Sequence, residues 1–138
     1  MGFNDEISSV VNWNAPSVDI NDSLRDVIKK MVENRTSALT VTVDGTVAGV
    51  VTEMDVMMCT DEGLDLDETK ASRLMTSCEI IGSSGAKSPC VQLDAEQSAE
   101  MALGVMNRAG VHHLMVTGEN DKVTGMVSIL DLLKLVIS

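Results

Sequence analysis

The chain has 138 residues, of which 44% are apolar and only two, Phe3 and Trp13, are aromatic. Its length suits one compact body or two small halves that share an aliphatic core, with ten methionines as adaptable filler. The formal net charge of −11 argues against binding to nucleic acid or to an anionic membrane surface, since both need clustered Lys and Arg.

The first predicted elements are an extended segment and an amphipathic helix. Residues 14–21 ("NAPSVDIN") carry a proline and are typical of an extended opening. Residues 23–34 ("SLRDVIKKMVEN") predict a helix that Asp22 or Ser23 caps. The apolar positions of this helix recur at helical spacing: Leu24, Val27, Ile28, Met31 and Val32.

A β-hairpin and a second helix follow. Residues 38–52 ("ALTVTVDGTVAGVVT") form two β-rich runs joined by Asp44-Gly45. An Asp-Gly pair between such runs predicts a type I′ turn, which needs positive φ at both central residues. Residues 53–59 ("EMDVMMC") predict a short helix. The first part of the chain therefore predicts the order β-α-β-β-α.

The remainder of the chain repeats this order after a connection. Residues 69–75 ("TKASRLM") predict a short helix, and a Ser/Gly-rich loop follows. The second copy consists of four segments: an extended opening at 88–94, a helix at 98–110 that Gly110 ends, a hairpin with a longer turn at 113–128, and a closing helix at 129–137. In the second helix one face carries Ala99, Ala102, Leu103 and Met106. We expect a first unit at residues 1–62, a connection at 63–89 and a second unit at 90–138.

One nine-residue pattern occurs in both copies, as "VAGVVTEMD" at 47–55 and "VTGMVSILD" at 123–131. Thr52-x-x-Asp55 and Ser128-x-x-Asp131 each match a capping box, and the strand glycines would then allow close packing. The same geometry suits a ligand. A carboxylate at a helix N-terminus can accept hydrogen bonds from both hydroxyls of a ribose, while the hydroxyl and backbone N–H groups address phosphate. The motif alone fits both interpretations.

The whole repeat resembles a tandem pair of CBS domains, the regulatory unit often called a Bateman module. The resemblance covers about residues 10–137, and its most specific parts are "GVVTEMD" and "GMVSILD". It implies an α/β (α+β) fold of two β-α-β-β-α units packed with pseudo-two-fold symmetry. It also implies a sensor, not an enzyme, that binds AMP, ADP, ATP or S-adenosylmethionine in clefts between the domains. Such pairs commonly form homodimers and gate an enzyme or a transporter.

The resemblance further implies two sets of ligand-binding residues, in which the aspartate of each motif holds the ribose. The residues carried over to one cleft are Asp131, Ser128, His112, His113, Thr36, Ser37 and Asn14. Those carried over to the other cleft are Asp55, Thr52, Thr76 and Val111. We expect the Asp131 cleft to be the occupied one, because "VHHL" precedes its middle strand where the first copy has "TSAL". The acidic chain and the partial charge of histidine favour AMP, ADP or another adenosyl ligand of low charge over ATP.

Other functions receive less support. Neighbouring strand residues such as His112 and His113 point to opposite faces, so we expect no metal site. Cys59, Cys78 and Cys90 lack CxxC spacing and a nearby acid-base pattern, which favours a reducing cytoplasm over disulfides, zinc or a catalytic thiol. The chain has no P-loop, GxSxG, HExxH or Rossmann fingerprint. Two alternatives stay open: a ligand-free dimerisation scaffold, and a subunit separated from a larger enzyme or channel.

Overall fold

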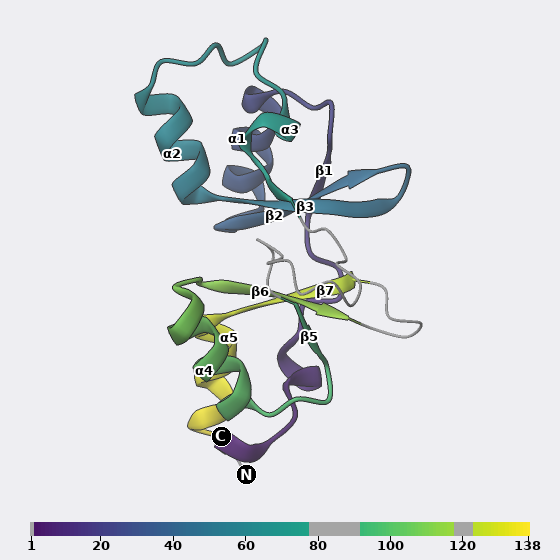
Figure 1. The fold of residues 1–138 in the computed structure, drawn as a ribbon, viewed down its shortest axis with the longest axis vertical. Helices are drawn as coiled ribbons and strands as arrows, with labels where there is room; N and C mark the ends of the chain where they lie inside the picture. The colour runs from purple at the N-terminus through teal and green to yellow at the C-terminus, as the bar shows by residue number, and fades with distance from the viewer. Residues whose placement is uncertain (1, 78–91, 118–122) are drawn as a thin grey trace. The chain divides into compact units, whose positions relative to one another are not determined.

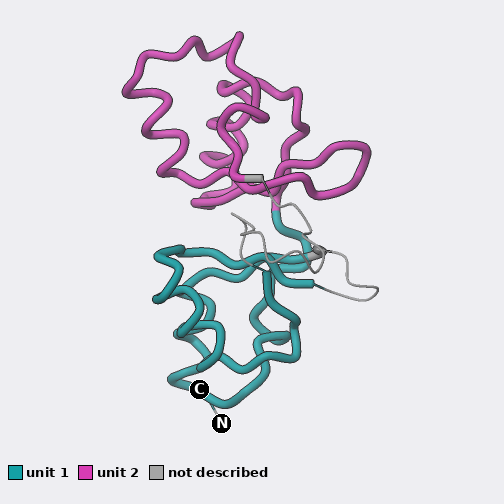
Figure 2. Tube along the Cα trace, in the orientation of Figure 1, with its two compact units in different colours: residues 1–15, 91–138 teal, residues 16–90 magenta. Residues whose placement is uncertain are grey.

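The protein folds into two compact units, seen in a computed structural model that describes residues 2–77, 92–117 and 123–138 (Figure 1). Residues 16–90 make up unit 2, whereas unit 1 combines residues 1–15 with residues 91–138 (Figure 2). In each unit a small sheet carries its helices on one face (Figure 1). The mixed α+β fold expected from the repeat is therefore confirmed. Among the described residues no helix has the length and apolar character needed to cross a bilayer.

Unit 2 contains a four-stranded sheet in the order β1-β2-β3-β4. Its elements are β1 (Ser17–Asp19), α1 (Leu24–Asn34), β2 (Ala38–Val43), β3 (Thr46–Thr52), α2 (Glu53–Asp61), α3 (Ala71–Leu74) and β4 (Thr76–Ser77). Strand β1 runs parallel to β2, and the other two pairings are antiparallel. The core between sheet and helices includes Leu24, Val27, Leu39, Val41 and Val51, all fully buried.

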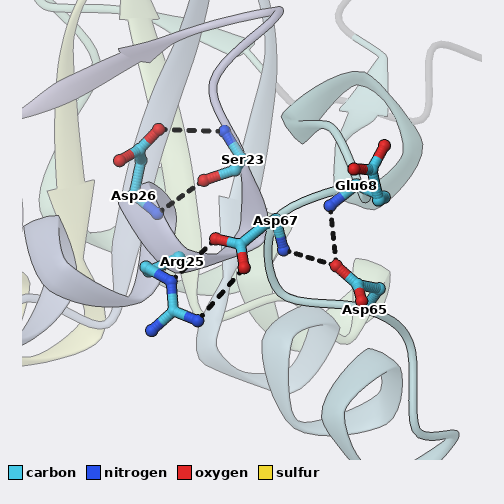
Figure 3. Close-up of polar contacts among 6 residues, drawn as sticks. All are labelled: Ser23, Arg25, Asp26, Asp65, Asp67 and Glu68. Atoms are coloured by element: carbon cyan, nitrogen blue, oxygen red, sulfur yellow. Dashed lines mark hydrogen bonds and ion pairs between the residues drawn. The ribbon is translucent and has the colours of Figure 1, made fainter.

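Helix α1 begins as the sequence predicts. Ser23 Oγ accepts a hydrogen bond from the Asp26 N–H at 3.1 Å, and the Asp26 carboxylate accepts one from the Ser23 N–H at 3.1 Å (Figure 3). The prediction that Val32 belongs to the apolar face is wrong, because its side chain is 70% exposed. Eight positions after Leu24, Val32 is rotated about 80° from it around the helix, beyond the edge of the buried stripe. The helix therefore packs on a narrower face than its pattern indicated.

The hairpin turn of unit 2 also agrees with its sequence signal. Asp44 and Gly45 have φ values of 49° and 79°, as a type I′ turn requires. A register shift between Val41 and Thr42 lies near this turn. The shift lies on the turn side of Leu39, Val41 and Val51, so the apolar alternation that directs these three side chains into the core is kept.

Unit 1 repeats the same order around a three-stranded sheet, β5-β6-β7. Its elements are the 3-10 helices η1 (Gly2–Asn4) and η2 (Ile7–Val10), then β5 (Gln92–Asp94), α4 (Ala99–Ala109), β6 (His113–Thr117), β7 (Val123–Ser128) and α5 (Ile129–Val136). Gly110 ends α4 with φ 69°, as predicted. The longer hairpin turn falls at residues 118–122, and the loop end with Cys78 and Cys90 at 78–91, both outside the described residues.

The segment before the first repeat packs onto the second repeat, a feature that the sequence patterns did not indicate. Ile7 and Val11 are part of the core of unit 1, and Ile7 is fully buried. Asn12 forms an antiparallel bridge with Met126, with N–H···O distances of 2.9 and 3.2 Å. In unit 2 the segment before the second repeat holds the corresponding place, with β4 paired to β3. Each repeat is thus completed by the segment that precedes the other repeat.

Candidate functional site

The two motif aspartates occupy the same local structure in their separate units. In unit 1, Asp131 Oδ2 accepts hydrogen bonds from the Ser128 N–H at 3.0 Å and from the Ser128 hydroxyl at 2.9 Å. In unit 2, Asp55 Oδ2 accepts them from the Thr52 N–H at 2.9 Å and the Thr52 hydroxyl at 3.1 Å. Both capping boxes are complete, so the structural interpretation of each motif is confirmed.

The residues at the start of β6 and of β2, and those just before them, lie beside these capping boxes. In unit 1, His113 pairs with Ser128 across the sheet, and the Ile129 N–H at the start of α5 donates to the His112 carbonyl at 3.2 Å. His112, His113, Ser128 and Asp131 therefore gather at the N-terminus of α5, and we call them the Asp131 cluster.

Unit 2 holds an equivalent set at the N-terminus of α2. Ala38 pairs with Thr52, and the Glu53 N–H donates to the Ser37 carbonyl at 2.9 Å. We call Ser37, Ala38, Thr52 and Asp55 the Asp55 cluster. The two hydrogen-bond patterns superimpose residue by residue, so Ser37 corresponds to His112 and Ala38 corresponds to His113.

Four other predicted site residues lie near these clusters or along the elements that support them. In unit 2, the Thr36 hydroxyl donates to the Ala38 carbonyl at 2.9 Å, and Thr76 pairs with Val50 in the sheet. In unit 1, the Asn14 N–H donates to Asn12 Oδ1 at 3.0 Å, and the Val111 N–H donates to the Met106 carbonyl at 3.1 Å. The sharing of a cleft by Thr36 and Ser37 with Asp131, or by Val111 with Asp55, would combine both units and stays a prediction.

The motif glycines permit close approach of the backbone. A Cβ on Gly125 would lie 2.5 Å from Val11 Cγ1 and 3.0 Å from Trp13 Cε3. A Cβ on Gly49 would lie 2.5 Å from the Thr76 carbonyl oxygen and 2.8 Å from Met75 Sδ. Such distances are far below normal contact, so a side chain at either strand position would force its neighbours to shift. The space beside each glycine is filled by the chain itself, which confirms the packing interpretation.

A cation lies next to one of the two aspartates. Lys134 Nζ is 3.7 Å from Asp131 Oδ1, with the lysine side chain 66% exposed and the aspartate side chain 29% exposed. The residue at the corresponding position of α2 is Met58. The sequence analysis did not select Lys134, although its i+3 spacing from Asp131 places both on one helix face.

Other titratable groups belong to the framework. The Arg25 guanidinium forms two hydrogen bonds with the Asp67 carboxylate, at 2.8 and 3.3 Å, and ties the segment before α3 to α1 (Figure 3). This contact lowers the pKa of Asp67, and the hydrogen bonds from Ser23 lower the pKa of Asp26. Burial raises the pKa of the Cys59 thiol, which keeps it protonated at neutral pH. In the described part of the chain no three His, Cys, Asp or Glu residues gather as metal ligands would.

The geometry of each cluster can recognise a sugar. One carboxylate oxygen is held by the capping box, which fixes the orientation of the other. A carboxylate oxygen fixed in this way can accept hydrogen bonds from vicinal hydroxyls. The second N–H group of each helix, that of Met54 in α2 and of Leu130 in α5, lies in the first turn and therefore has no carbonyl partner within its own helix. Such a group can donate a hydrogen bond to an anion.

The family model and the similar solved structures indicate the same family. The CBS domain model matches residues 7–60 and 81–138. A putative signal-transduction protein with CBS domains from Burkholderia ambifaria is 27% identical, with a TM-score of 0.76 over 91% of this chain and 85% of that chain. A CBS domain protein from Pyrobaculum aerophilum, complexed with AMP, is 22% identical, with a TM-score of 0.75 over 96% of this chain and 99% of that one.

A third similar structure is the CBS domain of a bacterial CNNM/CorC family Mg²⁺ transporter in complex with ATP. It is 16% identical, with a TM-score of 0.76 over 98% of this chain and 89% of that chain. No curated protein matches this sequence.

Proposed function

Because the chain belongs to the CBS-domain family, we propose that it is a regulatory module that binds an adenosine-containing ligand at the Asp131 cluster. Occupancy of that cluster would be transmitted to a partner, either an enzyme or a transporter. The observation that carries the proposal is the fixed carboxylate of Asp131, with Oδ2 held by Ser128 and Oδ1 beside a cation. The complexes with AMP and ATP of two similar structures support this ligand class.

The choice of the Asp131 cluster over the Asp55 cluster follows from their side chains. The Asp131 cluster carries His112 and His113, where the Asp55 cluster has Ser37 and Ala38. Imidazoles can donate hydrogen bonds to phosphate and carry partial positive charge near neutral pH. The only tryptophan, Trp13, also lies in unit 1, packed on Gly125 and 41% exposed. Unit 1 therefore offers aromatic and cationic groups that unit 2 lacks at the same places.

The ligand we favour is AMP, ADP or another adenosyl compound of low charge. A chain with a net charge of −11 attracts a polyphosphate poorly, because the long-range field opposes it. Imidazoles and one lysine can balance one or two phosphate charges more easily than the charge of ATP. S-adenosylmethionine, with its sulfonium and amino groups, stays among the candidates for the same reason.

The test is ligand binding to the wild type, to Asp131→Asn and to Asp55→Asn. Asparagine keeps a capping oxygen but removes the charge that a ribose would contact, and the Asp55 variant is the matched control. We expect one adenosyl ligand to raise the Tm, with about 2.7 kcal/mol of added stability at about 100 times its Kd. The shift should disappear in Asp131→Asn and persist in Asp55→Asn.

Trp13 gives an independent readout, since the fluorescence of a single tryptophan reports on unit 1 alone. A ligand that shifts the Tm should change this emission in the wild type and not in Asp131→Asn. The absence of any response to AMP, ADP, ATP and S-adenosylmethionine, in folded protein free of bound nucleotide, would contradict the proposal.

A second candidate function is a dimerisation scaffold that needs no ligand. Helices α2 and α5 expose several large apolar side chains: Met54, Met57, Met58, Leu130, Leu133 and Val136. Exposed apolar clusters often mark protein–protein contacts. Sedimentation of the wild type and of Leu133→Glu with and without AMP separates the two. A dimer unaffected by nucleotide, with no nucleotide binding, favours the scaffold.

A further inference from the structure

The ion pair between Asp131 and Lys134 distinguishes the Asp131 cluster from its counterpart in unit 2. Asp131 Oδ2 is committed to the capping box, so Oδ1 is the oxygen available to a ligand, and Lys134 Nζ lies 3.7 Å from it. In the described part of unit 2, Asp55 Oδ1 has no cation beside it, since Met58 occupies the corresponding position. A ribose that binds Oδ1 must therefore meet or displace an ammonium in unit 1 only.

The local charge of the two helix starts differs in the same direction. The first turn of α2 contains Glu53 and Asp55, so the start of this helix carries two negative charges. Asp131 is the only acidic residue in the first turn of α5, and the positive charge of Lys134 offsets its negative charge. Glu53 and Lys134 are exposed, so solvent weakens these Coulomb interactions without changing their sign. A phosphate would thus be repelled at the α2 start and tolerated at the α5 start.

The lysine is also free to move when a ligand arrives. Its side chain is 66% exposed, and a pair at 3.7 Å is longer than a good charge-assisted hydrogen bond. When sugar hydroxyls take Asp131 Oδ1, the ammonium can turn away from the carboxylate without being buried. A nucleoside monophosphate carries its phosphate on the same sugar, within reach of a long flexible side chain.

We propose that Lys134 is the cation that the Asp131 cluster supplies to the phosphate of its ligand, and that it sets the preference for AMP over adenosine. This inference rests on the proposed function, because it assigns a phosphate partner within the same site. The backbone of His112 and His113 lies beside the same helix start, and Lys134 adds an ammonium group to this cluster.

The experiment compares binding of AMP and adenosine, by calorimetry, to the wild type, Lys134→Met and Lys134→Arg. Methionine is the residue that unit 2 has at this position. We expect Lys134→Met to weaken AMP roughly three- to tenfold, as loss of an exposed or partly exposed charge pair does, and to leave adenosine within about twofold. Lys134→Arg should retain most of the AMP affinity. The loss should shrink as salt rises from 0.05 to 0.5 M.

The matched control is Lys30→Met, which removes an exposed lysine from α1 in unit 2 and should leave both affinities unchanged. Equal weakening of AMP and adenosine in Lys134→Met would overturn the inference, because it would mean that Lys134 only positions Asp131. Unchanged AMP affinity would overturn it as well, with the proposed function intact. If neither ligand binds a wild type that does bind ADP, ATP or S-adenosylmethionine, this inference fails while the proposed function stands. If none of these compounds binds, both fail.

Discussion

The two units are built on one hydrogen-bonding plan, yet they differ where a ligand would bind. In both, a Ser/Thr-x-x-Asp capping box starts the helix that follows the hairpin, and the residue before the middle strand binds that helix start. Unit 1 places histidines and a lysine around this frame, whereas unit 2 places small side chains and Met58 there. The frame is thus required by folding, and the side chains around it are free to differ between the units.

The cores show the same freedom in another form. The Ala99 N–H donates to the Asp5 carbonyl, as the Leu24 N–H donates to the Thr69 carbonyl. The Ile7 N–H in unit 1 likewise takes the place that the Ala71 N–H has in unit 2, where it donates to the Asp22 carbonyl. Unit 1 therefore combines a large Ile7 with a small Ala99, and unit 2 combines a large Leu24 with a small Ala71. The two units distribute side-chain volume differently over equivalent positions.

The largest expected effect comes from removing the large member of this pair in unit 1. Ile7→Ala should lower the free energy of unfolding by about 2–5 kcal/mol, because Ile7 is fully buried and the cavity cannot collapse completely. Urea denaturation followed by circular dichroism measures it. Val32→Ala, at an apolar position that is 70% exposed, is the control and should change stability by less than about 0.5 kcal/mol. A loss below 1 kcal/mol for Ile7→Ala would mean that unit 1 does not need the segment before the first repeat for its stability.

Substitution of the motif glycines should lower the free energy of unfolding by a smaller amount, and this amount should differ between the two units. Gly49→Ala and Gly125→Ala should each cost about 1–3 kcal/mol, as overpacking does. We expect the larger loss for Gly49→Ala, since its Cβ would meet the Thr76 backbone oxygen, whereas at Gly125 the nearest atom belongs to the Val11 side chain. The free energy of unfolding of both variants, measured side by side, decides the order. The reverse order would show that β4 shifts more easily than Val11 does.

The smallest effect concerns a contact of unit 2 with no counterpart among the described residues of unit 1. Arg25 pairs with Asp67, while the position of Arg25 in unit 1 is taken by Glu100. The pKa of Asp67 is lower in the folded protein than in the unfolded chain, so its stabilising effect is present above the unfolded pKa of about 4 and is lost as the pH falls through the folded value. The Tm of Asp67→Asn should therefore fall less steeply below about pH 4 than that of the wild type.

The control for this pH dependence is Arg25→Met, which removes the partner that lowers the pKa of Asp67. Thermal unfolding followed from pH 7 to pH 2 should give similar slopes for Arg25→Met, Asp67→Asn and the double variant. An Asp67→Asn slope equal to that of the wild type would show that the pair is broken in solution.

Local signals account for what the sequence could predict. The helix caps at Ser23, Thr52 and Ser128 and the Asp44-Gly45 turn depend on residues at most three positions apart, so composition at those positions determines them. Even there the predicted apolar face of α1 is wider than the buried face, because Val32 continues the apolar pattern but is exposed. The order of elements followed from these same short-range patterns.

Long-range packing escaped prediction for an equally physical reason. Ile7 and Val11 lie in a segment too short and irregular to show periodicity, and their core partners, such as Leu114 and Val127, are more than a hundred positions away. Nothing local tells such a segment which repeat it will join. For the candidate site, the sequence indicated the aspartates and the histidines, but it missed Lys134, whose relevance depends on which carboxylate oxygen the capping box leaves available.

The insertion of unit 2 within unit 1 has a consequence for biosynthesis. All residues of unit 2 are synthesised before residue 91, so this unit can begin to fold while translation continues. Residues 2–13 emerge earlier still, but the sheet and helices they pack against come last. At about 5–20 residues per second they wait roughly 6–25 s until the end of α5 is made. During that interval Ile7 and Val11 lack their core partners, so a segment made before unit 2 is buried only after unit 2 is complete.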